Sequence, residues 1–239
     1  MTTDPLAAVA EDAAAALAQA QAAVAAAAVA QSGGTGRFFR AGILFVISAP
    51  SGAGKTTLCA ALRQSRDFIY SVSCTTRAPR PGEVEGEDYY FLSMEEFRAR
   101  VAAGEFLEHA EVHGNFYGTL RENVLRHVRA GIDVLIDIDA QGAQTIRASD
   151  DPTIRAALAD VFIMPPSLDE LRRRLSRRGT ETPAQIEHRL VNAAAEMRRW
   201  HEYRYFILSA SVEEDLQKFR SIMRAERYRS RRFREVESC

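Results

Sequence analysis

The hydrophobic residues of the chain alternate between short continuous runs and segments with the spacing of an amphipathic helix. Continuous apolar runs, which predict strands buried on both faces of a sheet, occur at 43–48, 132–139, 159–164 and 205–208. Between the runs, apolar residues recur three or four positions apart, as in Leu168, Leu171 and Leu175, and predict helices with one buried face. Strands that alternate with helices predict an α/β fold around a parallel sheet.

The pattern changes between residues 73 and 119, where strands are short and a long polar loop occurs. Residues 68–73 are aromatic and β-branched and predict a strand, after which a loop rich in Pro, Gly and charge leads to a second strand at 89–92. Residues 93–96 form a capping box that opens a helix, and 106–118 predict a hairpin. We therefore expect a small β-rich insertion at 73–119.

The remaining segments divide the chain into a core, a lid and an N-terminal extension. Residues 1–30 contain 16 alanines, no Lys or Arg, and three acids, unlike a secretory signal or a mitochondrial presequence. Alanine favours helix but buries little area, so residues 1–40 are expected to be an Ala-rich extension with a flexible linker at 31–36, to which we assign no function. The folded domain is expected at 41–239, with its core at 41–72, 120–167 and 200–239 and its lid at 168–199.

Composition and charge narrow the classes of protein. The 239 residues are 46% hydrophobic, enough for a substantial core, and a net charge of −1 gives no reason to expect nucleic acid or a membrane as the partner. Three cysteines, Cys59, Cys74 and Cys239, form no C-x-x-C pair, which favours a reducing cytoplasm over a disulfide framework or a zinc site. A group of arginines in the C-terminal tail is expected to be solvated: Arg227, Arg229, Arg231, Arg232 and Arg234.

The first apolar run leads directly into a candidate phosphate loop. The segment from Ala49 to Thr57 has the sequence APSGAGKTT, and a helix is predicted over about residues 56–64. In such a strand–loop–helix unit, backbone N–H groups and the helix N-terminus bind phosphate, Lys55 reaches the β- and γ-phosphates, and the Thr56 hydroxyl binds Mg²⁺. Ala49 replaces the first glycine of the usual motif, but Lys55 is one of two lysines among 31 basic residues. The loop therefore predicts a nucleoside triphosphate site.

Two carboxylates stand at the end of the run at 132–139. Because side chains alternate along a strand, Asp137 and Asp139 are expected to share one face at its C-terminal end, where open parallel sheets bind their ligands. These acids could instead only solubilise the strand end. The segment at 168–178 carries several arginines on its polar faces, and by themselves they are more typical of a solvated helix surface.

Six longer motifs carry a resemblance to one known family. They are SGAGKTTL at 51–58, SVSCTTRAPRPGE at 71–83, GEDY at 86–89, GNFYGT at 114–119, DIDAQG at 137–142 and RGTE at 178–181. Over about residues 43–229 the chain resembles the guanylate kinases. The resemblance implies a P-loop kinase core with a parallel sheet flanked by helices, a β-rich GMP-binding insertion and a helical lid. It also implies cytoplasmic transfer of the γ-phosphoryl group of ATP to GMP or dGMP, with Mg²⁺ as cofactor.

The same resemblance implies roles for individual residues. The ATP-binding residues would be Ser51, Gly52, Ala53, Gly54, Lys55, Thr56 and Thr57. The GMP-binding residues would be Ser73, Arg77, Arg80, Glu83, Tyr89, Glu108, Tyr117, Thr119 and Asp139. The catalytic residues would be Lys55, Arg77, Arg174, Arg178 and Arg189. Thr56 is expected to bind Mg²⁺ directly, and Asp137 to lie in the outer shell of the ion.

Elementary chemistry agrees with these roles. A nucleotide phosphate is close to a dianion near neutral pH, and Arg77 and Arg80 with two tyrosine phenols would grip it. Guanine presents two adjacent donors, N1–H and the 2-amino group, which the Glu108 carboxylate can accept with help from Asp139, whereas AMP would leave a buried carboxylate without donors. No general base is needed, because the attacking phosphate oxygen is already ionised. The alternative for Tyr89 and Tyr117 is that they only pack.

Two other functions are open at this point. One is a kinase on the same scaffold for a phosphorylated sugar, which Glu108 disfavours. The other is a non-catalytic module that binds phosphopeptides, which the intact phosphate loop disfavours. Ser209 and Ala210 stand where the resembled family usually has Asn-Asp near the adenine, so no adenine contact is predicted there, and homo-oligomer formation is left open.

Overall fold

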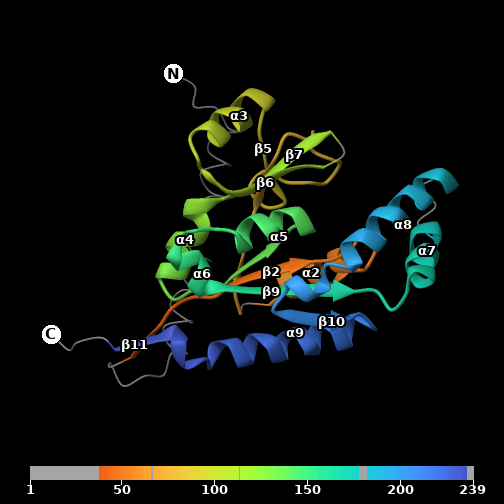
Figure 1. Ribbon diagram of the computed structural model, residues 1–239. Coiled ribbons are helices and arrows are strands. Elements are labelled where there is room, and N and C mark those ends of the chain that lie inside the picture. Colours follow the sequence, from red (N-terminus) through yellow and green to blue (C-terminus); the bar gives the residue numbers. More distant parts are fainter. Residues whose placement is uncertain (1–37, 66, 113, 178–181, 236–239) are drawn as a thin grey trace.

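A five-stranded parallel sheet forms the centre of the protein (Figure 1). The computed structural model describes residues 38–65, 67–112, 114–177 and 182–235. The strands of the sheet are β2 (Leu44–Ser48), β3 (Ile69–Tyr70), β8 (Val134–Asp137), β9 (Leu158–Met164) and β10 (Tyr205–Leu208). Their order is β10-β9-β2-β8-β3, and each neighbouring pair is parallel. The predicted α/β fold with a parallel sheet is confirmed.

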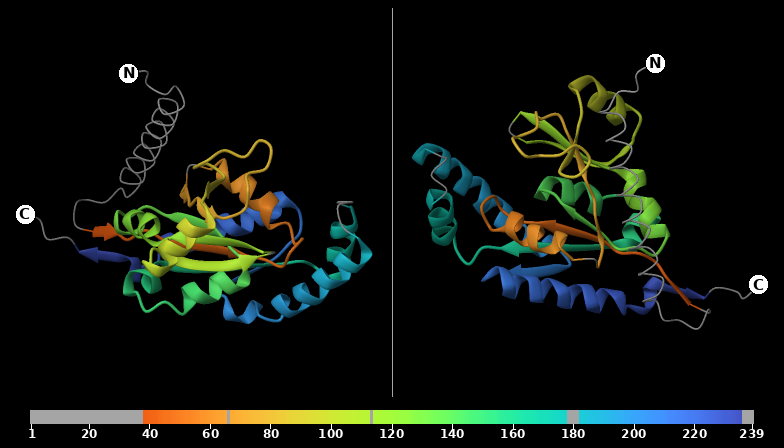
Figure 2. Two further views of the ribbon diagram at one scale, coloured as in Figure 1. Left: turned by 90° about the horizontal axis from the view of Figure 1, so that it is seen from above. Right: turned by 180° about the vertical axis from the view of Figure 1, so that it is seen from behind.

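Helices cover both faces of this sheet, as the views in Figures 1 and 2 show. They are α2 (Lys55–Arg63), α4 (Arg121–Arg129), α5 (Ala140–Arg147), α6 (Pro152–Ala157) and α9 (Val212–Arg227). In β2, Phe45 and Ile47 pack in a cluster with α2 and α9, whereas Leu44 and Val46 pack in a cluster with α4, α5 and α6. Burial on both faces explains why the strand is apolar at successive positions.

A second sheet forms most of the insertion predicted at 73–119. The strands of this sheet are β4 (Ser73–Thr75), β5 (Tyr89–Phe91), β6 (Phe106–Val112) and β7 (Asn115–Leu120), and the insertion also contains the helix α3 (Met94–Ala102). The order is β5-β4-β7-β6, and β6 and β7 form the predicted hairpin. The single strand predicted at 68–73 is divided between the sheets, because the chain leaves the core after β3 and enters the insertion at β4.

The lid consists of two helices, α7 (Leu168–Arg177) and α8 (Pro183–Met197), which extend beyond one end of the central sheet (Figure 1). They pack on each other and bury Leu171 and Leu175 completely. Leu168 was expected on the same buried face, but 39% of its surface is exposed and it lies outside the cluster, so that prediction was wrong.

The two ends of the described chain pair with each other. β1 (Phe38–Arg40) and β11 (Phe233–Glu235) form an antiparallel ribbon, so residues 38–40 are a strand where the sequence predicted the end of the N-terminal extension. The prediction that the C-terminal arginines are solvated was wrong for Arg232, which is 4% exposed and pairs with the buried Glu226, whereas Arg231 and Arg234 are exposed as predicted. The C-terminal segment is therefore held by specific polar contacts.

The chain between β8 and β9 differs from the sequence prediction. It forms α5 and α6, which the sequence did not predict. Asp137 ends β8, and Asp139 lies beyond the strand as the N-cap of α5, so the expectation that both acids share one strand face was wrong. The helix begins at this point because the Asp139 carboxylate accepts a 2.7 Å hydrogen bond from the N–H of Gly142. Two short 3-10 turns occur elsewhere, at Trp200–Glu202 and Ser230–Arg232.

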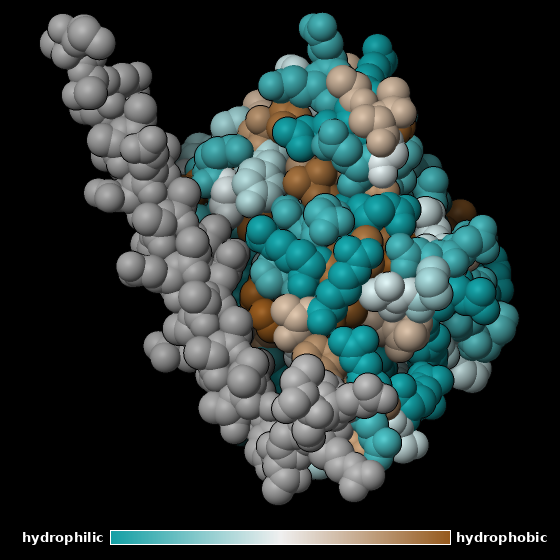
Figure 3. Space-filling view, turned by 90° about the vertical axis from the view of Figure 1, so that its left-hand side faces the viewer, coloured by the Kyte–Doolittle hydropathy of each residue, from teal (hydrophilic) through white to brown (hydrophobic). Residues whose placement is uncertain are grey.

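The surface is largely polar on the face shown in Figure 3, where hydrophobic residues form small separate areas between hydrophilic ones. The buried apolar side chains are gathered in the two cores of the sheet, in the contact between α7 and α8 and in the insertion. Within the described part of the chain, no helix is long and apolar enough to cross a membrane.

Candidate active site

The candidate phosphate loop lies between the end of β2 and the start of α2. Gly54 is the N-cap of α2 and has φ 99°, a left-handed conformation that strongly favours glycine, and Gly52 has φ 88°. Ala49, which replaces the first glycine of the motif, is 8% exposed and packs in the core cluster beneath the sheet. The substitution is thus accommodated by apolar packing, and the loop keeps the two glycines that turn it towards the helix N-terminus.

Lys55, at the start of α2, lies against the end of β8. Its Nζ atom is 2.5 Å from Oδ1 of Asp137 and donates to the carbonyl oxygen of Ile138 over 2.7 Å. Burial acts to lower the pKa of Lys55, but the neighbouring Asp137 carboxylate outweighs it and the pKa is raised overall. The side chain therefore remains an ammonium group next to the loop, where it can bind phosphate oxygens.

The lid contacts the same loop. Nη1 of Arg174 donates to the carbonyl oxygen of Ala53 over 3.0 Å, and its Nε donates to Glu170 over 2.8 Å. A Cβ at Gly52 would lie 2.9 Å from a methyl carbon of Leu175, so this glycine is also needed for the close approach of α7. The sequence analysis missed Glu170, although its i, i+4 spacing to Arg174 could have indicated the pair.

The other two arginines predicted to act from the lid are Arg189 and Arg178. Arg189 lies half-buried on α8. Arg178 lies outside the described residues. A further lid residue, Glu196 on α8, accepts a hydrogen bond from the backbone of Ser51, and burial together with the charge of Asp139 raises its pKa. Nothing in the spacing of the sequence indicated that Glu196 would contact the phosphate loop.

The predicted phosphate grip lies on the loop that follows β4. Nη2 of Arg77 donates to both carboxylate oxygens of Glu83, at 2.8 and 3.0 Å, and its guanidinium lies 5.4 Å from the ring centroid of Tyr89. The rings of Tyr89 and Tyr117 are 5.9 Å apart, and Tyr117 also hydrogen-bonds Arg77. The backbone N–H of Arg80 donates to Glu83 over 2.7 Å, so Glu83 organises the loop while the Arg80 side chain is exposed.

The predicted guanine pocket is centred on a buried carboxyl group. Glu108 on β6 is 5% exposed, and its Oε1 accepts a 2.7 Å hydrogen bond from Thr119 on β7. Burial, together with the nearby Asp139 charge, raises the pKa of Glu108 to about 7 although the Thr119 hydrogen bond acts to lower it. A Cβ at Gly142 would lie 2.6 Å from Oε2 of Glu108, so the missing side chain makes room for the carboxylate. Ser73, half-buried at the start of β4, is paired in register with Tyr89.

The sequence predicted contacts to Mg²⁺ from Thr56 and Asp137, and it left the adenine contacts near Ser209 and Ala210 unassigned. Among the described residues, no group of three or more His, Cys, Asp or Glu side chains could hold a metal ion. The exposed hydroxyl of Thr56 and the carboxylate of Asp137 are hard oxygen donors of the kind that Mg²⁺ prefers when it keeps several waters. Ser209 and Ala210 both hydrogen-bond Asp215, at 2.8 and 2.9 Å.

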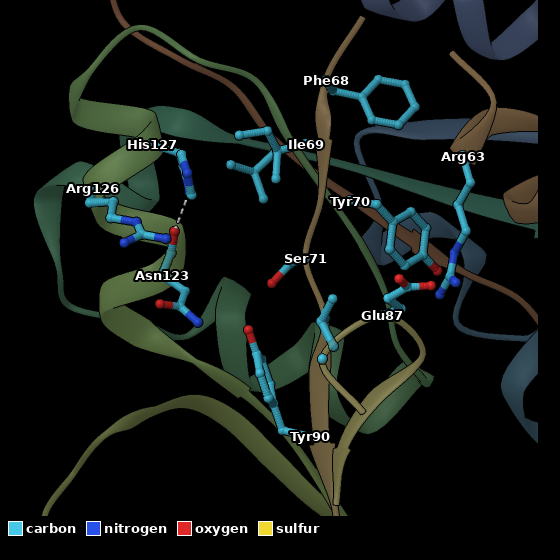
Figure 4. Close-up of a pocket in the computed structure, with 13 residues that line it drawn as sticks. Arg63, Phe68, Ile69, Tyr70, Ser71, Glu87, Tyr90, Asn123, Arg126 and His127 are labelled. Carbon is cyan, nitrogen blue, oxygen red and sulfur yellow. Dashed lines mark hydrogen bonds between the residues drawn. The ribbon is translucent and has the colours of Figure 1, made fainter. Parts of the chain in front are cut away.

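A cavity of about 380 Å³ lies beside the site, where the core joins the insertion (Figure 4). Its walls come from the end of α2, from β3, from the segment that leads into β5, and from α4. Arg63, Tyr70 and Glu87 lie together on one side of it, and His127 faces Asn123 on the other. None of the predicted site residues is in its lining.

The fold and the site define a P-loop kinase: a parallel sheet with a phosphate loop, a pair of helices that contacts the loop, and an insertion with the predicted phosphate grip and a buried carboxyl. The sequence model of the guanylate kinase family matches residues 42–226. The chain belongs to the guanylate kinase family.

Individual relatives agree with this membership. The guanylate kinase of Dechloromonas aromatica (strain RCB) is 50% identical over 186 residues, covering 77% of this chain and 90% of the relative. That of Maricaulis maris (strain MCS10) is 47% identical over 190 residues, covering 79% and 85%. The crystal structure of the guanylate kinase from Anaplasma phagocytophilum, at 38% identity, has a TM-score of 0.68 and covers 82% of this chain and 92% of that one.

Proposed function

We propose that the protein transfers the γ-phosphoryl group of ATP to GMP, giving ADP and GDP, and that it also accepts dGMP. The observation that carries this proposal is the buried carboxyl of Glu108, held by Thr119 on the same insertion as the Arg77 grip. The Glu108 carboxyl suits the two hydrogen-bond donors of a guanine, and the Arg77 guanidinium suits a phosphate dianion. Family membership and the phosphate loop support the same activity.

On the donor side, the chain binds and orients the triphosphate. The N–H groups of the loop and the N-terminus of α2 would face the β- and γ-phosphates. The Lys55 ammonium would reach them by giving up its contact with Asp137 or Ile138. Thr56 would bind Mg²⁺ directly and Asp137 through water, and the ion would neutralise charge on the transferring phosphoryl group. Arg174, Arg178 and Arg189 would add positive charge when the lid closes over the nucleotide.

On the acceptor side, the chain positions the attacking oxygen. Arg77 and Arg80 would bind the GMP phosphate, and Glu83 would hold Arg77 in place through its two hydrogen bonds. Tyr89 and Tyr117 would donate their phenols to the same phosphate, while Ser73 and Thr119 would face the O6 side of the guanine. Glu108 and Asp139 would accept from N1–H and the 2-amino group.

No residue needs to remove a proton, because the attacking oxygen of GMP is already ionised. Catalysis then rests on alignment of the two phosphates and on stabilisation of charge in the transition state. Closure of α7 and α8 would exclude water and so limit ATP hydrolysis. The contact between Arg174 and the carbonyl of Ala53 supports this role, because the lid already meets the loop.

The two alternatives are not favoured. A kinase for a phosphorylated sugar would have no use for a buried carboxyl at Glu108, and a phosphopeptide-binding module would have no use for the Lys55–Asp137 pair beside a phosphate loop. We also propose a cytoplasmic location, which the free thiols of Cys59 and Cys74 support.

A comparison of acceptors tests the proposal. ADP production is measured with Mg²⁺ and ATP against GMP, dGMP, AMP, UMP and ribose 1,5-bisphosphate. We expect rapid turnover with GMP and dGMP, and a preference over AMP of at least about 10⁴-fold in kcat/KM. Absence of turnover with GMP would overturn the proposal, and equal turnover with AMP would overturn the role of Glu108.

A further inference from the structure

Two residues with no assigned role, Arg63 and Tyr70, stand between the insertion and the phosphate loop. Arg63 is the last residue of α2, and Tyr70 is the last residue of β3. Figure 4 shows the two side chains next to each other on one wall of the cavity at the junction. The guanidinium carbon of Arg63 lies 4.0 Å from the ring centroid of Tyr70, which is a cation–π contact.

Tyr70 continues this contact to the donor site. Its hydroxyl donates to Oδ2 of Asp137 over 3.3 Å, and the other oxygen of Asp137 is 2.5 Å from the Lys55 ammonium. A phenol is protonated at neutral pH, so the Tyr70 hydroxyl is the donor and the Asp137 carboxylate the acceptor. Tyr70 therefore restrains the carboxylate that pairs with the lysine of the phosphate loop.

Arg63 continues the contact to the insertion. Its Nη1 lies 3.7 Å from Oδ1 of Asp88, and the other oxygen of Asp88 accepts from the backbone N–H of Val84. Asp88 directly precedes Tyr89, whose ring packs on Tyr117 and faces Arg77 in the acceptor grip. Three consecutive contacts, from Asp88 through Arg63 and Tyr70 to Asp137, thus join the insertion next to the acceptor grip to the Lys55–Asp137 pair.

We propose that Arg63 and Tyr70 are positioning residues that couple occupancy of the acceptor site to the orientation of Lys55 and Asp137. The insertion is separated from β3 by Ser71 and Val72 alone, so a movement of the insertion towards its ligand changes the distance from Asp88 to Arg63. Arg63 in turn fixes the ring of Tyr70, and the Tyr70 hydroxyl sets the position of the carboxylate. GMP binding then favours one arrangement of the donor site, and by linkage a bound donor favours GMP.

This coupling role rests on the proposed donor and acceptor sites. Isothermal titration calorimetry measures the coupling directly. The dissociation constant of GMP is determined alone and with a saturating non-hydrolysable ATP analogue and Mg²⁺; their ratio is the coupling factor. In Tyr70→Phe and Arg63→Met we expect this factor to fall by about three- to tenfold towards one. The affinity for GMP alone should change by less than about twofold, because neither side chain belongs to the acceptor grip.

Matched variants separate coupling from a general loss of stability. Arg100→Met removes a different arginine–carboxylate pair of the insertion, the 3.3 Å contact with Glu105, and should leave the coupling factor unchanged. Asp88→Asn removes the carboxylate that Arg63 contacts on the insertion and should also lower the coupling factor. Arg63→Lys keeps the positive charge and should retain more of the coupling than Arg63→Met. A second readout is steady-state kinetics, in which Tyr70→Phe should lower kcat more than it changes KM for GMP.

The results distinguish this inference from the proposed function. If the unmodified protein phosphorylates GMP but binds its two ligands independently, the coupling role is overturned and the function stands. A coupling factor unchanged in both Tyr70→Phe and Arg63→Met has the same meaning. If the unmodified protein does not phosphorylate GMP, the proposed function fails first, in an assay that involves neither variant.

Discussion

The hydroxyl of Thr119 on β7 donates a 2.7 Å hydrogen bond to the carboxyl of Glu108 on β6, and both residues are buried. A carboxyl with so little contact with water is costly to ionise, and the pKa of Glu108 is accordingly raised to about 7. A guanine placed against it would supply two donors and favour the ionised form. Protonation and ligand binding at Glu108 are therefore linked.

The affinity for GMP should depend on pH through Glu108. In the proposed function the ionised carboxyl accepts from guanine. Since its pKa without ligand is about 7, lowering the pH from 8 to 6 should weaken GMP binding by about tenfold through this group. Titration calorimetry at several pH values measures this. In Glu108→Gln, the only pH dependence of GMP binding that should remain is the one caused by the GMP phosphate, whose second pKa is near 6. An equal pH dependence in both proteins would contradict the assignment.

The same group affects stability in the absence of ligand. A carboxyl whose pKa is raised above its usual value of 4.5 destabilises the folded protein progressively as the pH rises from about 4.5 through 7. Glu108→Gln should therefore raise the unfolding temperature at pH 8 and have little effect at pH 5. Thermal unfolding of the ligand-free protein at the two pH values is the measurement.

Gly142 should control the position of Glu108. A methyl group at this residue would stand 2.6 Å from Oε2 of Glu108, closer than real contacts allow, so Gly142→Ala should displace the carboxyl and raise KM for GMP about tenfold or more. KM for ATP should change little. The shorter acid in the double variant with Glu108→Asp should recover part of the loss, and a failure of Gly142→Ala to affect GMP would show that the pocket has more room.

Lys55 should be needed for turnover and not for acceptor binding. Lys55→Ala removes the ammonium group next to the phosphate loop, and we expect a loss in kcat of at least about a hundredfold, with GMP affinity within about threefold. The matched control is Lys218→Ala, which should retain full activity. Lys218, the other lysine of the chain, lies on α9 and donates a hydrogen bond to the carbonyl of Leu208. Joint loss of turnover and GMP binding in Lys55→Ala would mean that this residue holds the fold.

The C-terminal segment should be sensitive to acid through Glu226. Burial acts to raise the pKa of Glu226, but hydrogen bonds from Tyr205, Arg232 and Arg229 lower it to about 2. A carboxyl with a lowered pKa contributes stability above about pH 4.5 and loses that contribution as the pH falls towards 2. Glu226→Gln should therefore reduce the free energy of unfolding by about 3 kcal/mol at pH 7, and by about half as much at pH 3.5.

Urea unfolding at the two pH values provides this measurement. Glu95→Gln, which changes an exposed acid in the first turn of α3, is the control and should have little effect at either pH. A loss for Glu226→Gln that does not depend on pH would indicate that packing, and not ionisation, explains its contribution.

Several parts of the fold could be predicted because their signals are local. The continuous apolar runs gave β2, β9 and β10 nearly to the residue, and the Ser93–Glu96 capping box gave the start of α3. The phosphate loop was predictable because Gly54, Lys55 and Thr56 are adjacent in the chain. The individual site assignments stay predictions until the variants above are measured.

Other parts were missed because their cause lies far away in the chain. The strand predicted at 68–73 is divided because two different sheets offer partners to its two halves. Arg227 was assigned to solvent because nothing near it in the sequence shows that Asp133, 94 positions away, accepts its hydrogen bond. Contacts at this separation depend on how the whole chain packs.

The sequence by itself determined the α/β alternation, the phosphate loop and the chemical types of the acceptor residues, because each depends on neighbouring positions and on side-chain chemistry. Only the tertiary structure decided that Gly142 makes room for Glu108, and that Arg63 and Tyr70 link Asp88 to Asp137. These relations join elements distant in sequence, and their distances are set by the packing of helices on two separate sheets.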